Sequence, residues 1–274
     1  GLEDAVEARL EERGLDRVAG AAGRKQLESL LQGVTFTDLS LDLLDEQVFE
    51  RAERAIDEQY GDAPLLQARL WQSVADTLRE LGRLEDAVQP QERALELRRR
   101  ELGSERRLAL EALRERGHLR LAHGRLEAAE TDLQAAEAGL RRVVGAEHPA
   151  TLQTLLHLGE LRYELGDFES AEEHTRLAVD GFRRQLGEEH PETLDAINNL
   201  AVLLVARGKL AEAEPLHRQA LEGRRRAFGV DSLEALQSLH NTALLFLQSG
   251  RPAEAEAAFR EALAGKRRVL GDEH

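Results

Sequence analysis

The sequence lacks cysteine and methionine and has few aromatic residues. Without cysteine, disulfide bonds, thiolate catalysis and cysteine-ligated zinc sites are excluded, and the composition agrees with the cytoplasmic location that we expect. Without methionine the chain has no initiator residue, so we interpret Gly1 as the product of processing or of an expression tag. Aromatic residues make up only 4% of the chain, which predicts a core of leucine and alanine packed between helices.

Long apolar runs and net positive charge are also missing. The longest unbroken apolar run, 200–206, is far shorter than the roughly 20 residues that a membrane-spanning helix needs. No signal-peptide pattern opens the chain. The formal net charge is −15, which opposes association with nucleic acids and with anionic membrane surfaces. We therefore expect neither nucleic-acid binding nor membrane insertion.

Two series of glycines run through most of the chain with a common spacing of 42 residues. No insertion or deletion interrupts either series, and self-similarity over such a length predicts a stacked repeat protein. The first series is Gly61, Gly103, Gly145, Gly187, Gly229 and Gly271, and the second is Gly82, Gly124, Gly166, Gly208 and Gly250.

Each repeat reads as a pair of helices. In residues 188–229, apolar side chains recur every three or four positions before Gly208, which predicts one helix, and the same spacing resumes from Leu210 to Leu221. Glycine after each stripe suits the left-handed conformation that ends a helix. Two alanine positions recur in every repeat and predict close helix contacts. They are Ala87, Ala129, Ala171, Ala213 and Ala255, and Ala94, Ala136, Ala178, Ala220 and Ala262.

This pattern resembles the tetratricopeptide repeat. The 42-residue period, the junction L/F-G-x-E-H-P-x-T-L and the N-N-L-A run of the first helix resemble the kinesin-light-chain subtype, and Trp71 occupies the family's tryptophan position. The resemblance implies an all-α fold, a right-handed superhelical solenoid of antiparallel helix hairpins. It covers Asp62–Gly271 as five units, 62–103, 104–145, 146–187, 188–229 and 230–271.

The flanking segments depart from the repeat. We interpret 1–37 as an N-terminal helical lead-in or linker and 38–61 as a degenerate capping half-repeat. Residues 272–274 restart the pattern, so we expect a further, truncated repeat there. Residues 43–88 are similar to segments of bacterial eukaryotic-like Ser/Thr kinases and of NTPase-linked signalling proteins, although no kinase motif is present.

No residue pattern predicts catalysis, a cofactor or a metal. His148, His190 and His274 keep the 42-residue register, so each is one hairpin away from the next and we interpret them as structural junction residues. Paired carboxylates are frequent in so acidic a chain, and we interpret them as part of a solvent-exposed helix face. We expect a protein that is not an enzyme.

The concave side of a stack of hairpins is its usual binding surface, and the first helix of each hairpin lines it. Asn199 and Asn241 occupy one repeat position there, and an amide can both donate to and accept from a peptide backbone. In the resembled family, asparagines at this position hold peptide main chain; the alternative is a bond to the neighbouring first helix. The groove is polar from Arg69 to Glu164 and then apolar around Val202, Val205, Leu244 and Leu247. The candidate groove residues are Arg69, Gln72, Ser73, Asp76, Arg114, Glu115, His118, His157, Glu160, Tyr163, Asn198, Asn199, Val202, His240, Asn241 and Leu244.

These observations predict a non-catalytic protein–protein interaction scaffold that binds an extended peptide or a partner helix in the concave groove. The alternative is an autoregulatory or self-association segment of a larger signalling protein, with an intramolecular or homotypic partner. The sequence does not identify the peptide.

Overall fold

The computed structural model describes residues 49–271, which contain eleven helices and no strand. The chain divides into two compact units, Gly1–Gly61 and Asp62–His274. In the first unit the structure describes one helix, α4 (Glu50–Gln59). The predicted lead-in, much of the predicted capping half-repeat and the restart at 272–274 lie outside the described residues.

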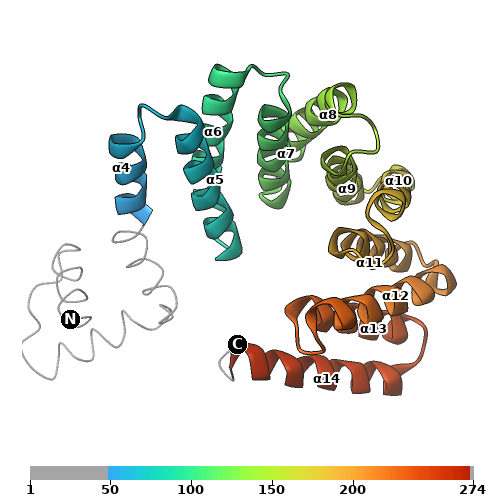
Figure 1. Ribbon diagram of the computed structural model, residues 1–274. Coiled ribbons are helices and arrows are strands. Elements are labelled where there is room, and N and C mark those ends of the chain that lie inside the picture. Colours follow the sequence, from blue (N-terminus) through green and yellow to red (C-terminus); the bar gives the residue numbers. More distant parts are fainter. Residues whose placement is uncertain (1–48, 272–274) are drawn as a thin grey trace, which may run out of the picture. The chain divides into compact units, whose positions relative to one another are not determined.

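From Asp62 onward the fold is an all-α array of helical hairpins, as predicted. Helices pair in chain order, and each pair packs against the next. In Figure 1 the pairs follow an arc, with α7, α9 and α11 on its inner side and α8, α10 and α12 outside. The pairs are α5 (Pro64–Glu80) with α6 (Leu84–Leu102), α7 (Arg107–Ala122) with α8 (Leu126–Val143), α9 (Pro149–Glu164) with α10 (Phe168–Leu186), α11 (Pro191–Ala206) with α12 (Leu210–Phe228), and α13 (Leu233–Gln248) with α14 (Pro252–Leu270).

The two glycine series end the helices. Gly208 follows α11 with φ of 72°, and Gly229 ends α12 with φ of 97°. Side chains with a Cβ rarely adopt such positive φ values, so glycine lets the chain reverse direction within a few residues. The constant period therefore keeps the helix lengths and turns the same in successive hairpins.

Histidines at the junctions between repeats cap the N-termini of two first helices, α9 and α11. The Nδ1 atom of His148 accepts a hydrogen bond from the backbone N–H of Ala150 at 3.1 Å, and Nδ1 of His190 accepts from Glu192 at 3.3 Å. Each bond satisfies an N–H at the beginning of a helix that has no partner within the helix. The structural interpretation of these two histidines is confirmed, whereas His274 lies outside the described residues.

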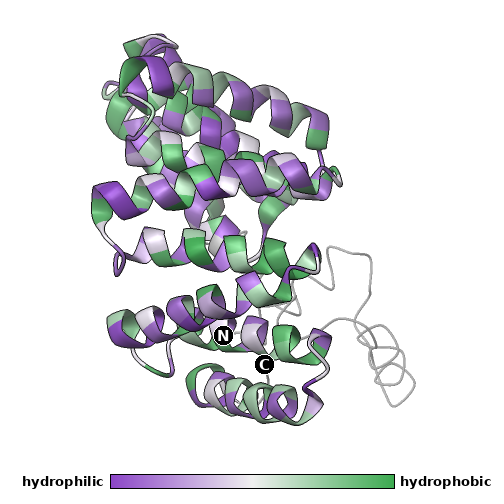
Figure 2. Ribbon diagram, turned by 90° about the vertical axis from the view of Figure 1, so that its right-hand side faces the viewer, coloured by the Kyte–Doolittle hydropathy of each residue, from purple (hydrophilic) through white to green (hydrophobic). Residues whose placement is uncertain are grey.

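The core lies between the helices and consists mainly of leucine and alanine. All ten alanines of the two repeated positions are at most 3% exposed, and Trp71 is 1% exposed with the guanidinium of Arg93 4.4 Å from its ring centroid. Figure 2 shows the resulting alternation of hydrophobic and hydrophilic residues along the helices. The predicted burial of these positions is confirmed.

A third glycine series, which the sequence analysis missed, brings the helices of a hairpin together. A Cβ atom added to Gly223 would lie 2.4 Å from Cδ2 of Leu194, and the glycine–leucine pair recurs in the other three hairpins from α7 to α14. In α5 and α6 the same register positions carry Ala68 and Leu97, so the small and large residues are exchanged. The pairs are Gly139 with Leu110, Gly181 with Leu152, Gly223 with Leu194, and Gly265 with Leu236.

Ion pairs repeat with the same period. An arginine near the end of α8, α10, α12 and α14 contacts an acidic residue at the junction before the first helix of the same hairpin. These pairs are exposed, so solvent screening leaves each with little effect on stability. They are Arg142 with Glu105, Arg184 with Glu147 at 2.7 Å, Arg226 with Glu189 at 2.8 Å, and Arg268 with Asp231 at 2.6 Å.

Candidate interaction groove

All sixteen candidate residues lie on the first helices of the hairpins, α5, α7, α9, α11 and α13. They differ in accessibility. The exposed ones are Arg69, Ser73, Tyr163, Val202 and Leu244; the half-buried ones are Gln72, Asp76, Arg114, Glu115, His118, Glu160, Asn199 and His240; the buried ones are His157, Asn198 and Asn241.

Gln72 takes part in a hydrogen-bond network that joins three helices. It accepts from Nη1 of Arg98 at 3.0 Å and donates to Oε1 of Gln91 at 2.7 Å. Gln91, which is fully buried, donates in turn to the carbonyl of Ala112 at 2.9 Å. The network therefore fixes α5, α6 and α7 relative to one another. The sequence analysis missed Gln91 and Arg98 because they lie on a second helix and do not recur in every repeat.

Beside this network lies a polar hollow of about 270 Å³. Its three arginines and three carboxylates balance in formal charge, and Asp76 and Arg79 lie 3.5 Å apart. Burial lowers the pKa of Arg98. Both donors and acceptors thus face the hollow, which suits a polar side chain of either charge. The lining residues are Gln72, Asp76, Arg79, Arg98, Glu111, Arg114 and Glu115.

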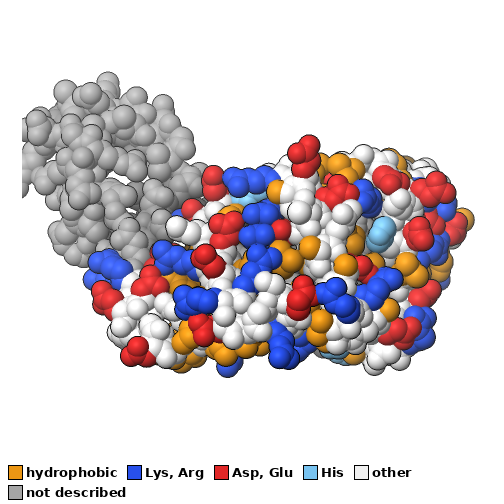
Figure 3. All heavy atoms as spheres, turned by 90° about the horizontal axis from the view of Figure 1, so that it is seen from above, with side chains coloured by type: hydrophobic (Ala, Val, Ile, Leu, Met, Phe, Trp, Pro, Cys, Tyr) orange, Lys and Arg blue, Asp and Glu red, His pale blue; other side chains and the backbone are white. Residues whose placement is uncertain are grey.

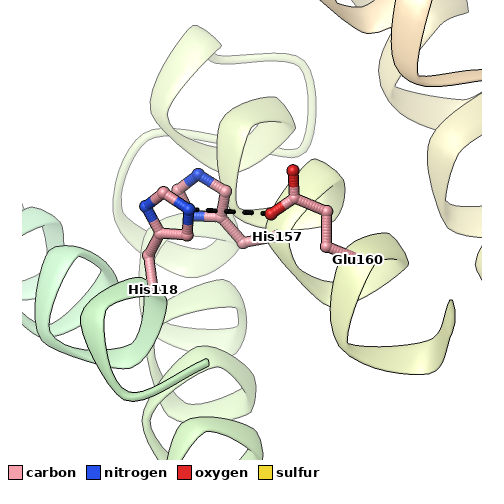
Figure 4. A group of neighbouring side chains, drawn as sticks. All are labelled: His118, His157 and Glu160. Carbon is pink, nitrogen blue, oxygen red and sulfur yellow. Dashed lines mark ion pairs between the residues drawn. The ribbon is translucent and has the colours of Figure 1, made fainter. Parts of the chain in front are cut away.

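His118 of α7 meets His157 and Glu160 of α9 (Figure 4). The two imidazole rings stack with centroids 4.0 Å apart and planes 11° from parallel. Nε2 of His118 lies 3.7 Å from a carboxylate oxygen of Glu160. Burial lowers the pKa of both histidines, that of His157 strongly, and raises the pKa of Glu160 to about 7 with a contribution from nearby Glu164.

The sequence analysis did not bring these three side chains together as one group. It compared histidines that share the repeat register, such as His148 and His190, and these are one hairpin apart. His118 and His157 are 39 residues apart, so they occupy different positions of adjacent repeats and meet across the helix interface. Among residues 49–271, no other three His, Asp or Glu side chains bring donor atoms within 4.8 Å of one another.

Asn241 braces two first helices. Its side chain is 9% exposed, and its Nδ2 donates to Oδ1 of Asn198 on α11 at 3.2 Å. The same Oδ1 atom accepts from the hydroxyl of Ser238 at 3.5 Å. This contact agrees with the alternative for Asn241, a bond to the neighbouring first helix. Asn199 itself is half-buried, so the two register-equivalent asparagines are in different environments.

The C-terminal part of the groove is apolar. Val202 on α11 and Leu244 on α13 share one repeat position and are 39% and 40% exposed, and Leu247 lies one turn further along α13, also exposed. Val205, which the sequence analysis placed with them, is buried and belongs to the core. Tyr163 of α9 packs edge-on against Phe168, with ring centroids 5.4 Å apart.

Charge is mixed elsewhere on the surface. Figure 3 shows acidic and basic side chains interspersed over one face of the described residues.

Within 49–271 there is no helix whose length and apolar character would let it cross a membrane.

Comparison with known proteins identifies the repeats. The profile of the family described as tetratricopeptide repeat matches residues 66–142, 108–184, 171–226 and 192–268. Together these overlapping stretches cover all of 66–268, which is most of the chain. A search of curated proteins found no match.

Solved structures share the fold. BtubC (BKLC) from P. vanneervenii has 22% identity and a TM-score of 0.67, with 82% of this chain and 92% of that chain covered. The TPR-like repeats of a kinesin light chain candidate from Podosopora anserina have 23% identity and a TM-score of 0.59, with 73% and 95% covered. The resemblance to kinesin-light-chain-like repeats is therefore confirmed at the level of the fold, whereas the resemblance of 43–88 to kinase tails stays a prediction.

Proposed function

Because the chain belongs to the tetratricopeptide repeat family, we propose that it is a scaffold that binds an extended peptide along its first helices. Repeats of this family bind protein partners, and the fold is generally non-catalytic. Membership of the family supports a general protein-binding role. That the bound partner is a peptide, and that it lies in the groove of the first helices, is our proposal.

The observation that carries the proposal is the change of surface character along the first helices. Polar and charged side chains line α5 and α7 around the hollow, whereas Val202, Leu244 and Leu247 expose apolar surface on α11 and α13. Exposed apolar side chains in adjacent repeats mark a place where a partner can bury them. A peptide with polar residues over α5–α7 and apolar anchors over α11–α13 matches this order.

The proposal can be tested with a displayed library of random peptides, selected on the wild-type chain. The test variant is Val202→Ser/Leu244→Ser. Covering the exposed part of these two side chains contributes about 1–2 kcal/mol, so selected peptides should bind the variant roughly tenfold more weakly. The matched control is Val143→Ser/Val269→Ser, because these valines of α8 and α14 are similarly exposed at 43% and 47%.

Equal affinities for wild type, test variant and control would contradict the groove, as would an equal loss in both variants. Sedimentation of the chain alone distinguishes self-association. A concentration-dependent dimer that the test variant abolishes would show that a second copy of the chain, instead of a foreign peptide, covers this surface.

A further inference from the structure

We infer that His118, His157 and Glu160 form a binding site for one divalent transition-metal ion of the Zn²⁺ type, between α7 and α9. This site goes beyond peptide binding, and it does not depend on it. Two imidazoles and a carboxylate are typical Zn²⁺ ligands, and three protein ligands leave a fourth position open.

The distances suit such a site after small side-chain rotations. One donor atom from each of the three residues lies within 4.8 Å of the others, and the closest ion pair, His118 to Glu160, spans 3.7 Å. Zn²⁺ ligands at 2.0–2.1 Å in a tetrahedron are roughly 3.4 Å apart. Donor atoms at the 4.8 Å limit must therefore approach each other by about 1.4 Å, which requires the stacked rings to rotate out of parallel.

The burial of His157 gives a second, independent observation. This side chain is 6% exposed, and its Nδ1 atom has no hydrogen-bond partner within the part of the chain that the structure describes. Its Nε2 atom lies 3.4 Å from Nε2 of Gln153. A buried polar nitrogen without a partner is unfavourable, and one ring nitrogen oriented by an amide while the other binds a metal is a common arrangement.

Charged groups of both signs lie around the site. Burial lowers the pKa of both histidines. The arginines Arg79 and Arg114 also lower the pKa of both, whereas Glu115 acts on His118 in the opposite direction. On α9, burial and the nearby Glu164 carboxylate raise the pKa of Glu160.

Within the part of the chain that the structure describes, three such donors come together only between α7 and α9, although the equivalent residues of α5 and α7, Asp76, Glu115 and His118, can also bind metals. His118 and Glu160 occupy the same repeat position on α7 and α9, and the equivalent residues on α11 and α13 are Val202 and Leu244. Neither valine nor leucine can bind a metal, so the ligand set does not follow from the repeat itself. His118 and Glu160 are half-buried on the groove side of their helices, so the open position can accept water or a side chain of a bound peptide.

The experiment uses the 274-residue chain without an affinity tag and no peptide, so its outcome is independent of the groove proposal. Zn²⁺ is titrated into the chain by isothermal titration calorimetry, and Co²⁺ binding is followed by its visible absorption. We expect one ion per chain. His118→Gln and Glu160→Gln should each weaken Zn²⁺ binding at least about tenfold, because even indirect partners of metal ligands contribute ten- to hundredfold.

Two further variants complete the test. His157→Gln should weaken binding in the same way; if its circular dichroism shows that it does not fold, the other two variants decide. His174→Gln is the control, because His174 lies on the second helix α10, outside the cluster and the groove, and the Zn²⁺ affinity of this variant should equal that of wild type. No stoichiometric Zn²⁺ binding, unchanged binding in His118→Gln and Glu160→Gln, or an equal loss in His174→Gln would each overturn the inference.

Discussion

The glycine–leucine contact inside each hairpin from α7 to α14 predicts a strong coupling between two positions. In the α11–α12 hairpin, a Cβ at Gly223 would lie 2.4 Å from Cδ2 of Leu194, whereas carbon atoms in contact prefer about 3.5–4.0 Å. Any side chain at 223 therefore displaces Leu194 by more than about 1 Å, in a core where Leu194 is fully buried. We expect Gly223→Leu to lower the free energy of unfolding by about 1–3 kcal/mol.

The reverse change supplies the matched partner. Leu194→Ala alone removes a buried leucine and should cost about 2–5 kcal/mol. Together, the two substitutions reproduce the arrangement that the first hairpin already has at Ala68 and Leu97. The double variant should therefore be more stable than the sum of the single changes predicts, with a coupling of about 0.5–3 kcal/mol.

The assay is urea unfolding of wild type, both single variants and the double variant, followed by circular dichroism. Since stacked repeats can unfold in stages, the curves are fitted with a nearest-neighbour description of the hairpins. A coupling of zero within the error would refute the size complementarity. A stable Gly223→Leu variant would show that the two helices do not approach each other as closely as described.

Three other changes test the packing. Ala213→Leu should overpack the contact between paired helices and cost about 1–3 kcal/mol in urea unfolding; an unchanged midpoint would mean that the contact is misplaced. Burial lowers the pKa of His217 to about 4 from its ordinary 6.5, so stability present above pH 6.5 should be lost as the pH falls towards 4, by up to about 3 kcal/mol. His217→Leu, which copies Leu133 of the equivalent position, should remove this dependence in melting curves measured from pH 7 to pH 4.5, and a wild-type curve that is flat with pH would contradict the assignment. Asn241→Ala leaves the buried Asn198 with one partner fewer and should lower stability by about 1–3 kcal/mol, whereas loss of peptide affinity without loss of stability would restore a binding role for Asn241.

The parts of the fold that recur in every repeat could be predicted from the sequence. Gly208 and Gly229 stand in uninterrupted series, and their positive φ values end helices where the series predicts. Ala213 stands in an alanine series that is equally uninterrupted, and it is buried as that series predicts. The glycine series through Gly223 was equally visible as a pattern, but its meaning depends on the facing Leu194, which only the structure identifies.

The contacts within the site that the sequence did not predict join residues at different positions of the repeat. Asn241 bonds with Asn198, one position away from the equivalent Asn199. His118 stacks on His157, three positions before Glu160, which is the register equivalent of His118. Period analysis compares equivalent positions, so it predicts the surface on which such residues lie and not the pairs that they form.

The central claim, that a peptide lies along the first helices, is tested most directly by site-specific photo-crosslinking. A photoreactive amino acid replaces Val202 in one variant and Val269 in another, and each is irradiated with a peptide selected from the library. Both valines are exposed, at 39% and 47%, but Val202 lies on α11 and Val269 on the second helix α14. We predict that the peptide crosslinks to position 202 and not to position 269. Crosslinks at 269 with none at 202 would contradict the account.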